Sequence, residues 1–307
     1  MKQLIYFFVL CLPMTVYGQK SFSTGTFQNL ESYKLMGSAK IVNDDLQLTD
    51  SEEWVSAACW YHKKALVQYG FETEFQFKID KHGGWQGKGA DGIAFVISND
   101  PKGFNIGDLG EGIGYQGLSN CLVIEFDTFD NQEGGDNHIS IHNNGQSKVS
   151  RFNNHSLAIN HKIPELQNTV RKAKITYDFQ YIRVYIDGIL YLKKEVHLEK
   201  KVKLSQGKAY IGFTASTAGA YSRHRILNWK WTRKKKILAA LPESNNESPR
   251  FIATNYKPIH HSYRQHNFHP FLSTKTTKKY LPIPSAWRQE NRTEIKRKNR
   301  LYYTSNC

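Results

Sequence analysis

Residues 121–142 read CLVIEFDTFDNQEGGDNHISIH and combine a strand pattern with many acidic side chains. The alternation over 122–129 is typical of a β-strand, in which side chains two positions apart share a face. Glu125 and Asp127 therefore point the same way, and Phe129 continues that face. Two carboxylates side by side on one strand indicate a chemical role for the face they share.

The acidic character extends beyond this strand. Between Gly103 and Ser147 the chain has seven Asp and Glu and no Lys or Arg, although its net charge is +15. Crowded carboxylates raise one another's pKa, and a bound cation is the simplest way to keep several of them ionised together. We therefore interpret the stretch as a metal site.

The residue types suit two kinds of ion. Asp127, Asn131 and Asp136, with a backbone carbonyl, are hard oxygen ligands of the kind that Ca²⁺ prefers. Glu125 with His138 suits Mn²⁺ or a zinc-like ion. Two adjacent ions that share Asp127 and Asp136 would use the whole set.

The segment EFDTFDN at 125–131, followed by DNHISI at 136–141, resembles the metal-binding strand and loop of the L-type (legume-type) lectins, the concanavalin A-like family. In plant lectins a longer insert separates the last Asp from the His. The resemblance implies a calcium ion held by Asp127, the Phe129 carbonyl, Asn131 and Asp136, and a second, transition-metal ion held by Glu125, Asp127, Asp136 and His138.

Alternating segments recur along the folded part of the chain and predict an all-β protein. Asp187-Gly188 separates two of them and predicts a hairpin, because both central residues of such a turn need positive φ. No segment has a convincing helical repeat, so we expect an antiparallel β-sandwich, the concanavalin A-like jelly roll. The expected strands are 39–48, 71–79, 92–97, 122–129, 138–141, 173–179, 181–186, 189–192 and 209–215.

A second motif, Gly89-Ala90-Asp91-Gly92, opens one of these strands. It resembles the setting in which L-type lectins place an Asp that accepts hydrogen bonds from two sugar hydroxyls, after a cis peptide bond. The resemblance implies that Asp91 is the sugar acceptor and that the Ala90–Asp91 bond is cis. A backbone N–H from the next glycine-rich loop would come from Gly110 or Gly112, and we favour Gly112.

The closing strands at 209–231 also resemble those of the lectins, whose intervening loop borders the sugar pocket. In that pocket the Asn131 amide would donate to the sugar, and Phe129 would stack under its apolar face. Tyr221 and Arg223 could reach a longer glycan. The function implied is calcium-dependent binding of glycans, without catalysis. The loop residues implied to offer backbone groups are Ala218, Gly219 and Ala220.

A glycoside hydrolase is the alternative. Glu125, Asp127 and Asp130 form an E-x-D-x-x-D pattern close to the E-x-D-x-x-E of retaining β-glucanases, which share a similar sandwich. In those enzymes the acids act as nucleophile, helper and acid/base. Here the third acid is Asp rather than Glu, and Asn131 and His138 have no task in that mechanism.

The two ends of the chain differ from its middle. Residues 1–18 contain Lys2 and an apolar run, which predicts a secretory signal peptide and a secreted or cell-envelope protein. Residues 233–307 hold 16 Lys and Arg against four Glu, a net +12, with six of the nine prolines, which predicts a disordered basic tail able to contact anionic surfaces. Residues 19–232, the lectin-like domain, hold 25 basic against 23 acidic side chains, a net +2, so their charge indicates no specific nucleic-acid partner. No pattern indicates an oligomeric state.

Three cysteines remain after the signal peptide, an odd number that does not suit a disulfide framework. Cys59 and Cys121 are either buried thiols or a single bridge, and Cys307 ends the chain.

Overall fold

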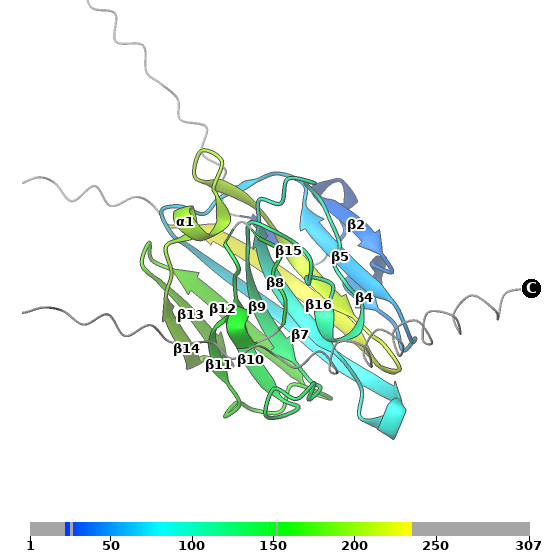
Figure 1. Ribbon diagram of the computed structural model, residues 1–307. Coiled ribbons are helices and arrows are strands. Elements are labelled where there is room, and N and C mark those ends of the chain that lie inside the picture. The colour runs from blue at the N-terminus through cyan, green and yellow to red at the C-terminus, as the bar shows by residue number, and fades with distance from the viewer. Residues whose placement is uncertain (1–21, 25–26, 146, 152, 235–307) are drawn as a thin grey trace, which may run out of the picture. The chain divides into compact units, whose positions relative to one another are not determined.

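The structure, a computed structural model, describes residues 22–24, 27–145, 147–151 and 153–234 (Figure 1). The expected signal peptide and nearly all of the expected basic tail lie outside the described residues. The described part forms two eight-stranded sheets, and every pair of named strands is antiparallel. The predicted all-β sandwich is confirmed.

The first sheet, sheet I, is built around two long strands, β7 and β16. Its order is β14 (Ile189–Glu195), β13 (Tyr181–Ile186), β12 (Val170–Tyr177), β7 (Phe71–Gly84), β16 (Ala220–Arg233), β4 (Asp45–Thr49) and β3 (Lys40–Val42), with β1 (Phe22–Thr24) also paired to β16.

The second sheet, sheet II, carries the acidic strand. Its order is β11 (Ser156–Asn160), β10 (His138–His142), β9 (Cys121–Asp127), β8 (Gly92–Ser98), β15 (Lys208–Ser216), β5 (Ser56–Tyr61) and β2 (Tyr33–Gly37), with β6 (Ala65–Leu66) also paired to β15. The helical segments are short: α1 (Leu198–Val202) and the 3₁₀ turns η1 (Leu30–Ser32), η2 (Trp85–Gly87), η3 (Gly110–Gly112) and η4 (Asn153–His155).

The core lies between the two sheets. Strand β7 buries alternate residues, as the period of two requires, and Phe75 at its centre reaches across to sheet II. The Phe75 ring centroid lies 4.9 Å from that of Phe213, 5.8 Å from Phe126 and 6.2 Å from Phe95. Burying each such ring contributes roughly 1.5–3 kcal/mol, so this aromatic layer is a main source of the sandwich's stability.

Strands β8 and β9 are buried on both faces. On β9, Ile124 and Phe126 face the core, whereas Val123 belongs to a second apolar cluster with Tyr115 and Val149. That cluster lies on the outer side of sheet II, beneath the loops that follow β8 and β10. Glu125, two residues after Val123, therefore points into a covered space and not into solvent.

Several expected strands have other bounds in the structure, and two of these differences bear on the prediction. The run 39–48 forms two strands, because Asn43 and Asp44 adopt positive φ (49° and 67°) and make a tight turn between them. Strand β9 ends at Asp127, so Phe129 lies beyond the strand rather than on its face. The hairpin at Asp187-Gly188 is confirmed, with φ of 51° and 86°.

The cysteines of the described part are buried thiols. Cys59 and Cys121 are both free, which decides between the two alternatives left by the sequence. Burial raises the pKa of each thiol well above its ordinary value, so both are inert packing groups. Among the described residues, no helix has the length and apolarity needed to cross a membrane.

Candidate metal and sugar site

Three side chains predicted as metal ligands meet at the end of β9. Glu125 and Asp127 are completely buried, and His138, the first residue of β10, pairs with Asp127 across the ladder. One possible ligand atom from each of the three lies within 4.8 Å of the others. The strand register therefore brings together residues more than ten positions apart in sequence.

Glu125 is held on one side only. Its Oε2 accepts hydrogen bonds from the Tyr115 hydroxyl (2.9 Å) and the Ser140 hydroxyl (2.9 Å), and it lies 2.7 Å from His142 Nε2. Burial acts to raise the pKa of Glu125, but His142 foremost, and then His138, hold it below its usual range. Its Oε1 has no hydrogen-bond partner. One oxygen is thus fixed by the protein, and the other is left for a different partner.

The pKa of Asp127 is shifted in the opposite direction to that of Glu125. Burial raises its pKa well above the ordinary value, and the negative charge of Glu125 raises it further. Its Oδ1 accepts the backbone N–H of Phe129 (2.7 Å), while its Oδ2 has no partner. Two adjacent buried carboxylates that cannot both ionise unaided are suited to a divalent cation, which would stabilise both charges.

His138 is oriented for the same task. Its Nδ1 lies 3.2 Å from the carbonyl oxygen of Gly135, to which a neutral imidazole can donate, and burial lowers its pKa. A ligating histidine typically makes such a second hydrogen bond, which fixes its tautomer. The neutral ring is the form that binds a metal.

Two further acids of the metal loop, Asp136 and Glu133, lie in different surroundings. The Asp136 side chain is 56% exposed and lies 3.6 Å from Lys88 Nζ, away from the buried carboxylates. The Glu133 side chain is only 5% exposed, its Oε2 has no partner, and its pKa is raised to about 7 by burial and then by the charge of Glu125. Glu133, which the sequence interpretation does not select, is thus buried close enough to Glu125 to be affected by its charge. Glu125, Asp127 and His138 are the residues whose ligand atoms lie close enough together to fit a divalent cation.

The local reason for the change is a turn built by Asp130. Its Oδ1 accepts the backbone N–H groups of Glu133 (2.9 Å) and Gly134 (3.3 Å), which folds the chain back and turns Glu133 inward. These backbone hydrogen bonds lower the pKa of Asp130. Asp130 is exposed and does not join Glu125 and Asp127, so the three-acid arrangement of the hydrolase alternative is not assembled.

Arg151 links the metal loop to its neighbour. Its guanidinium donates to the Asn131 carbonyl (3.0 Å), lies 3.5 Å from Glu133 Oε1 and forms an ion pair with Glu111 (2.7 Å). One cation therefore joins the loop after β9 to the turn η3. Sequence reasoning gave Arg151 no role, because nothing local marks which acids it reaches.

Asp91 lies at the bottom of a pocket beside this cluster. The Ala90–Asp91 bond is cis, as predicted. The Asp91 carbonyl accepts both the backbone N–H (2.8 Å) and the hydroxyl (2.9 Å) of Thr128, the residue after β9, and its N–H donates to Ser216 (3.2 Å). Its side chain is buried with Oδ2 unpartnered. Burial raises its pKa to about 8, and nearby Glu111 and Glu125 add to the rise, against the attraction of the Asn131 amide.

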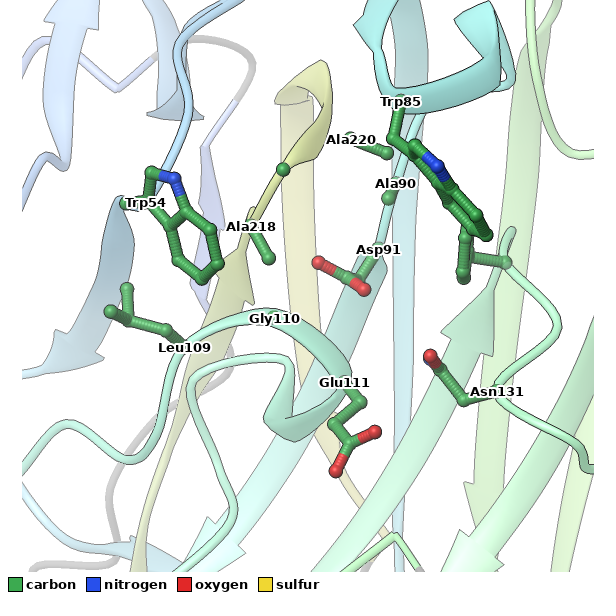
Figure 2. Close-up of a pocket in the computed structure, with 12 residues that line it drawn as sticks. Trp54, Trp85, Ala90, Asp91, Leu109, Gly110, Glu111, Asn131, Ala218 and Ala220 are labelled. Carbon is green, nitrogen blue, oxygen red and sulfur yellow. The ribbon is translucent and has the colours of Figure 1, made fainter. Parts of the chain in front are cut away.

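The pocket has a volume of about 360 Å³ and opens between loops from both sheets (Figure 2). Six of the predicted sugar-binding residues line it, from three separate segments of the chain. The remaining walls include four side chains that the sequence interpretation does not select, Trp54, Trp85, Leu109 and Glu111. The complete lining is Trp54, Trp85, Ala90, Asp91, Leu109, Gly110, Glu111, Phe129, Asn131, Ala218, Gly219 and Ala220.

Gly112, the favoured glycine, does not line the pocket; Gly110 does. Gly110 has φ of +58°, and a Cβ there would lie 3.0 Å from the Ala218 methyl group. The Gly110 N–H already donates to the Thr217 carbonyl (3.2 Å). Gly110 therefore leaves space for a ligand but does not offer it a free hydrogen-bond donor. Arg223 also stays outside the lining, because a two-armed contact holds its guanidinium on Asp80 (2.8 Å on each arm).

The comparisons with known proteins agree with this geometry. A family model described as "Legume lectin beta-barrel domain", the L-type lectin domain, matches residues 24–229. The chain belongs to this family. The L-type lectin domain thus covers nearly the whole described part, from the last residue of β1 to Trp229 within β16.

Solved structures and curated sequences of lectins are similar to this domain. The basic winged bean lectin, solved with Tn-antigen, has 25% identity and a TM-score of 0.58, covering 69% of this chain and 96% of that one. Lectin I-B4 of Griffonia simplicifolia, solved in a metal-free form, has 26% identity and a TM-score of 0.56, covering 70% and 99%. The L-type lectin-domain containing receptor kinase I.3 of Arabidopsis thaliana is 28% identical over 67% of this chain. The chain spans about a third of the length of that curated relative, 34%.

Proposed function

We propose that the domain binds carbohydrate in the pocket around Asp91. One observation carries the proposal: a buried carboxylate oxygen, Asp91 Oδ2, has no hydrogen-bond partner and lies in a pocket walled mainly by aromatic and apolar groups. An unsatisfied buried acceptor is costly, so a ligand that brings donors is favoured. Two neighbouring sugar hydroxyls supply those donors, while the apolar face of the ring can stack on Phe129.

Asn131 and the β15–β16 turn complete the recognition. Asn131 Nδ2 is buried without a partner, so it is placed to donate to a sugar hydroxyl. We propose that Ala218, Gly219 and Ala220 form the opposite wall and that Gly110, in place of Gly112, leaves room for the sugar beside Asp91. The pocket volume falls within the usual range for small-molecule sites, ~300–1,000 Å³.

We further propose that Glu125, Asp127, Glu133 and His138 hold divalent metal, with Ca²⁺ and Mn²⁺ as the expected ions and Glu133 taking the place first assigned to Asp136. Asn131 and the Phe129 carbonyl remain ligands proposed from the family pattern. A bound dication supplies the positive charge that lets the clustered acids ionise together. Thr128 then transmits the order of this loop to Asp91 through its two hydrogen bonds.

We propose that the protein acts outside the cytoplasm, since its first 18 residues have the pattern of a secretory signal peptide. The net charge of +12 over 233–307 supports an additional contact of that segment with anionic surfaces.

A glycan array with the full chain in Ca²⁺ tests the binding site. Asp91→Asn removes a charged acceptor for two hydrogen bonds, each worth roughly 1.5–3 kcal/mol, so binding should weaken at least about 100-fold. Asp44→Asn is the matched control, because Asp44 is exposed in the β3–β4 turn and Asn tolerates its φ of 67°. Glycan binding by Asp91→Asn equal to that of the control would refute the proposed site.

A further inference from the structure

Two tryptophans stand at the rim of the pocket, exposed to solvent. Trp54 is 62% exposed and Trp85 is 60% exposed, whereas the other tryptophans of the described part are buried in the core. Figure 2 shows them on opposite sides of Asp91, with Leu109 on the Trp54 side and Asn131 on the Trp85 side. Exposed indoles contribute little to the stability of the fold, so they are explained better by burial against a ligand.

Both tryptophans are attached to the same turn between β15 and β16. The backbone N–H of Trp54 donates to the carbonyl of Ala218 (3.3 Å), and that of Trp85 donates to Gly219 (2.8 Å). Gly84 comes so close that a Cβ there would lie 2.2 Å from the Gly219 oxygen. The backbone at both tryptophans is therefore held by the backbone of the sugar pocket itself, so less backbone ordering is needed when a ligand binds.

Backbone strain supports the importance of the Trp54 position. Trp54 adopts φ of +57°, a left-handed conformation that bulky residues rarely take. Such backbone strain lowers the stability of the fold, and it is concentrated at functional sites. On the opposite side, the Trp85 ring lies 6.0 Å from Phe129, the ring expected to stack under the sugar, at an angle of 48°. Aromatic surface thus extends outward from the central pocket in two directions.

The charge of the lining limits the ligand. Asp91 and Glu111 are the ionisable side chains among the residues lining this pocket, and no Lys, Arg or His is in that set. The lining therefore offers no cation to pair with a sulfated or carboxylated sugar. A neutral sugar offers hydroxyl donors to the acids and C–H faces to the indoles.

We infer that the pocket is the centre of an extended site for a neutral oligosaccharide of at least three units, with the central unit on Asp91 and a flanking unit stacked on each of Trp54 and Trp85. This inference rests on the proposed function, since it assumes that the central unit is a sugar. It assigns Trp54 and Trp85 as the residues that select for chain length. A protein partner seated on the two indoles is the competing occupant.

The test uses the full chain in Ca²⁺ with neutral mannose-, galactose- and glucose-based glycans of one to five units, together with their sulfated forms. The quantity measured is the ratio of affinities for a trisaccharide or longer glycan over its monosaccharide. In the wild type this ratio should be large. Trp54→Ala and Trp85→Ala should each lower it roughly 3- to 10-fold, the worth of one aromatic stacking contact, with a smaller loss of affinity for the monosaccharide than for the longer glycan. Trp54→Phe should restore most of the ratio.

Phe179→Ala is the control, because Phe179 is an exposed aromatic residue (55%) that does not line the pocket. Loss of all binding in Asp91→Asn together with a normal ratio in both Trp variants would overturn this inference and leave the proposed function standing. Equal loss of monosaccharide and oligosaccharide in the Trp variants would also overturn it. Unchanged binding in Asp91→Asn would instead overturn the proposed function. A sulfated glycan that binds better than its neutral form, and only when Asp91 is intact, would refute the neutral preference.

Discussion

Replacing Glu133 by Gln should weaken calcium binding far more than replacing Asp136 by Asn. The Glu133 side chain is 5% exposed, and for a buried pair at an effective dielectric constant near 20 the attraction between unit charges 4 Å apart is about 4 kcal/mol. A dication doubles that attraction, while its desolvation offsets part of it. We therefore expect Glu133→Gln to lose about 2.7 kcal/mol of calcium-binding free energy, which raises the Kd roughly 100-fold.

Asp136→Asn should change the Kd less than about threefold, because its side chain is 56% exposed and already near Lys88, where water screens the charge. The assay is calorimetric titration of Ca²⁺ into protein stripped with a chelator and dialysed, with thermal unfolding of the stripped variants as a check of the fold. A larger loss in Asp136→Asn than in Glu133→Gln would refute the proposed ligand set and return Asp136 to the site.

Three further predictions concern stability and pocket shape. Burial lowers the pKa of His224 to about 3, below the unfolded value near 6.5. The stability that comes from its neutral form is fully present above pH 6.5 and is lost as the pH decreases below that value. From pH 7 to pH 5 the free energy of unfolding in urea should therefore fall by about 2 kcal/mol more in the wild type than in His224→Asn, and equal losses would contradict this. Tyr115→Phe removes a hydrogen bond to the buried Glu125 carboxylate and should lower the free energy of unfolding by roughly 1.5–3 kcal/mol in metal-free protein; a change within error would show that bond to be unimportant. Gly110→Ala should weaken glycan binding roughly tenfold by placing a methyl group in the pocket, whereas Gly112→Ala should not, and the reverse order would restore Gly112 to the site.

The sequence predicted those parts of the fold that depend on local pattern. The strand through Glu125 and Asp127 and the Asp187-Gly188 hairpin follow from alternation and turn chemistry, and both are observed. The run 39–48 is predicted as one strand because its alternation continues through a two-residue turn, where Asn43 and Asp44 adopt positive φ. Periodicity alone does not distinguish one strand from two joined by so short a turn.

The parts of the site that were missed depend on contacts distant in sequence or on loop direction. Glu133 turns inward only because Asp130 accepts the backbone N–H groups that follow it, and Asp136 is then carried toward Lys88. Trp54 and Trp85 are far apart in the chain and meet the pocket only through the β15–β16 turn. Neither arrangement can be recognised from residue spacing. The family pattern therefore locates the pocket but does not predict the two tryptophans at its rim.

The central claim is that divalent metal orders the loop which positions Asp91 for the sugar. Its most direct test is the affinity of the best-bound array glycan, measured by calorimetry on the same protein with Ca²⁺, after chelator and dialysis, and after Ca²⁺ is restored, with circular dichroism to show that the sandwich stays folded. The account predicts that binding disappears in the stripped, folded protein and returns with Ca²⁺. Equal affinity in all three states would contradict it.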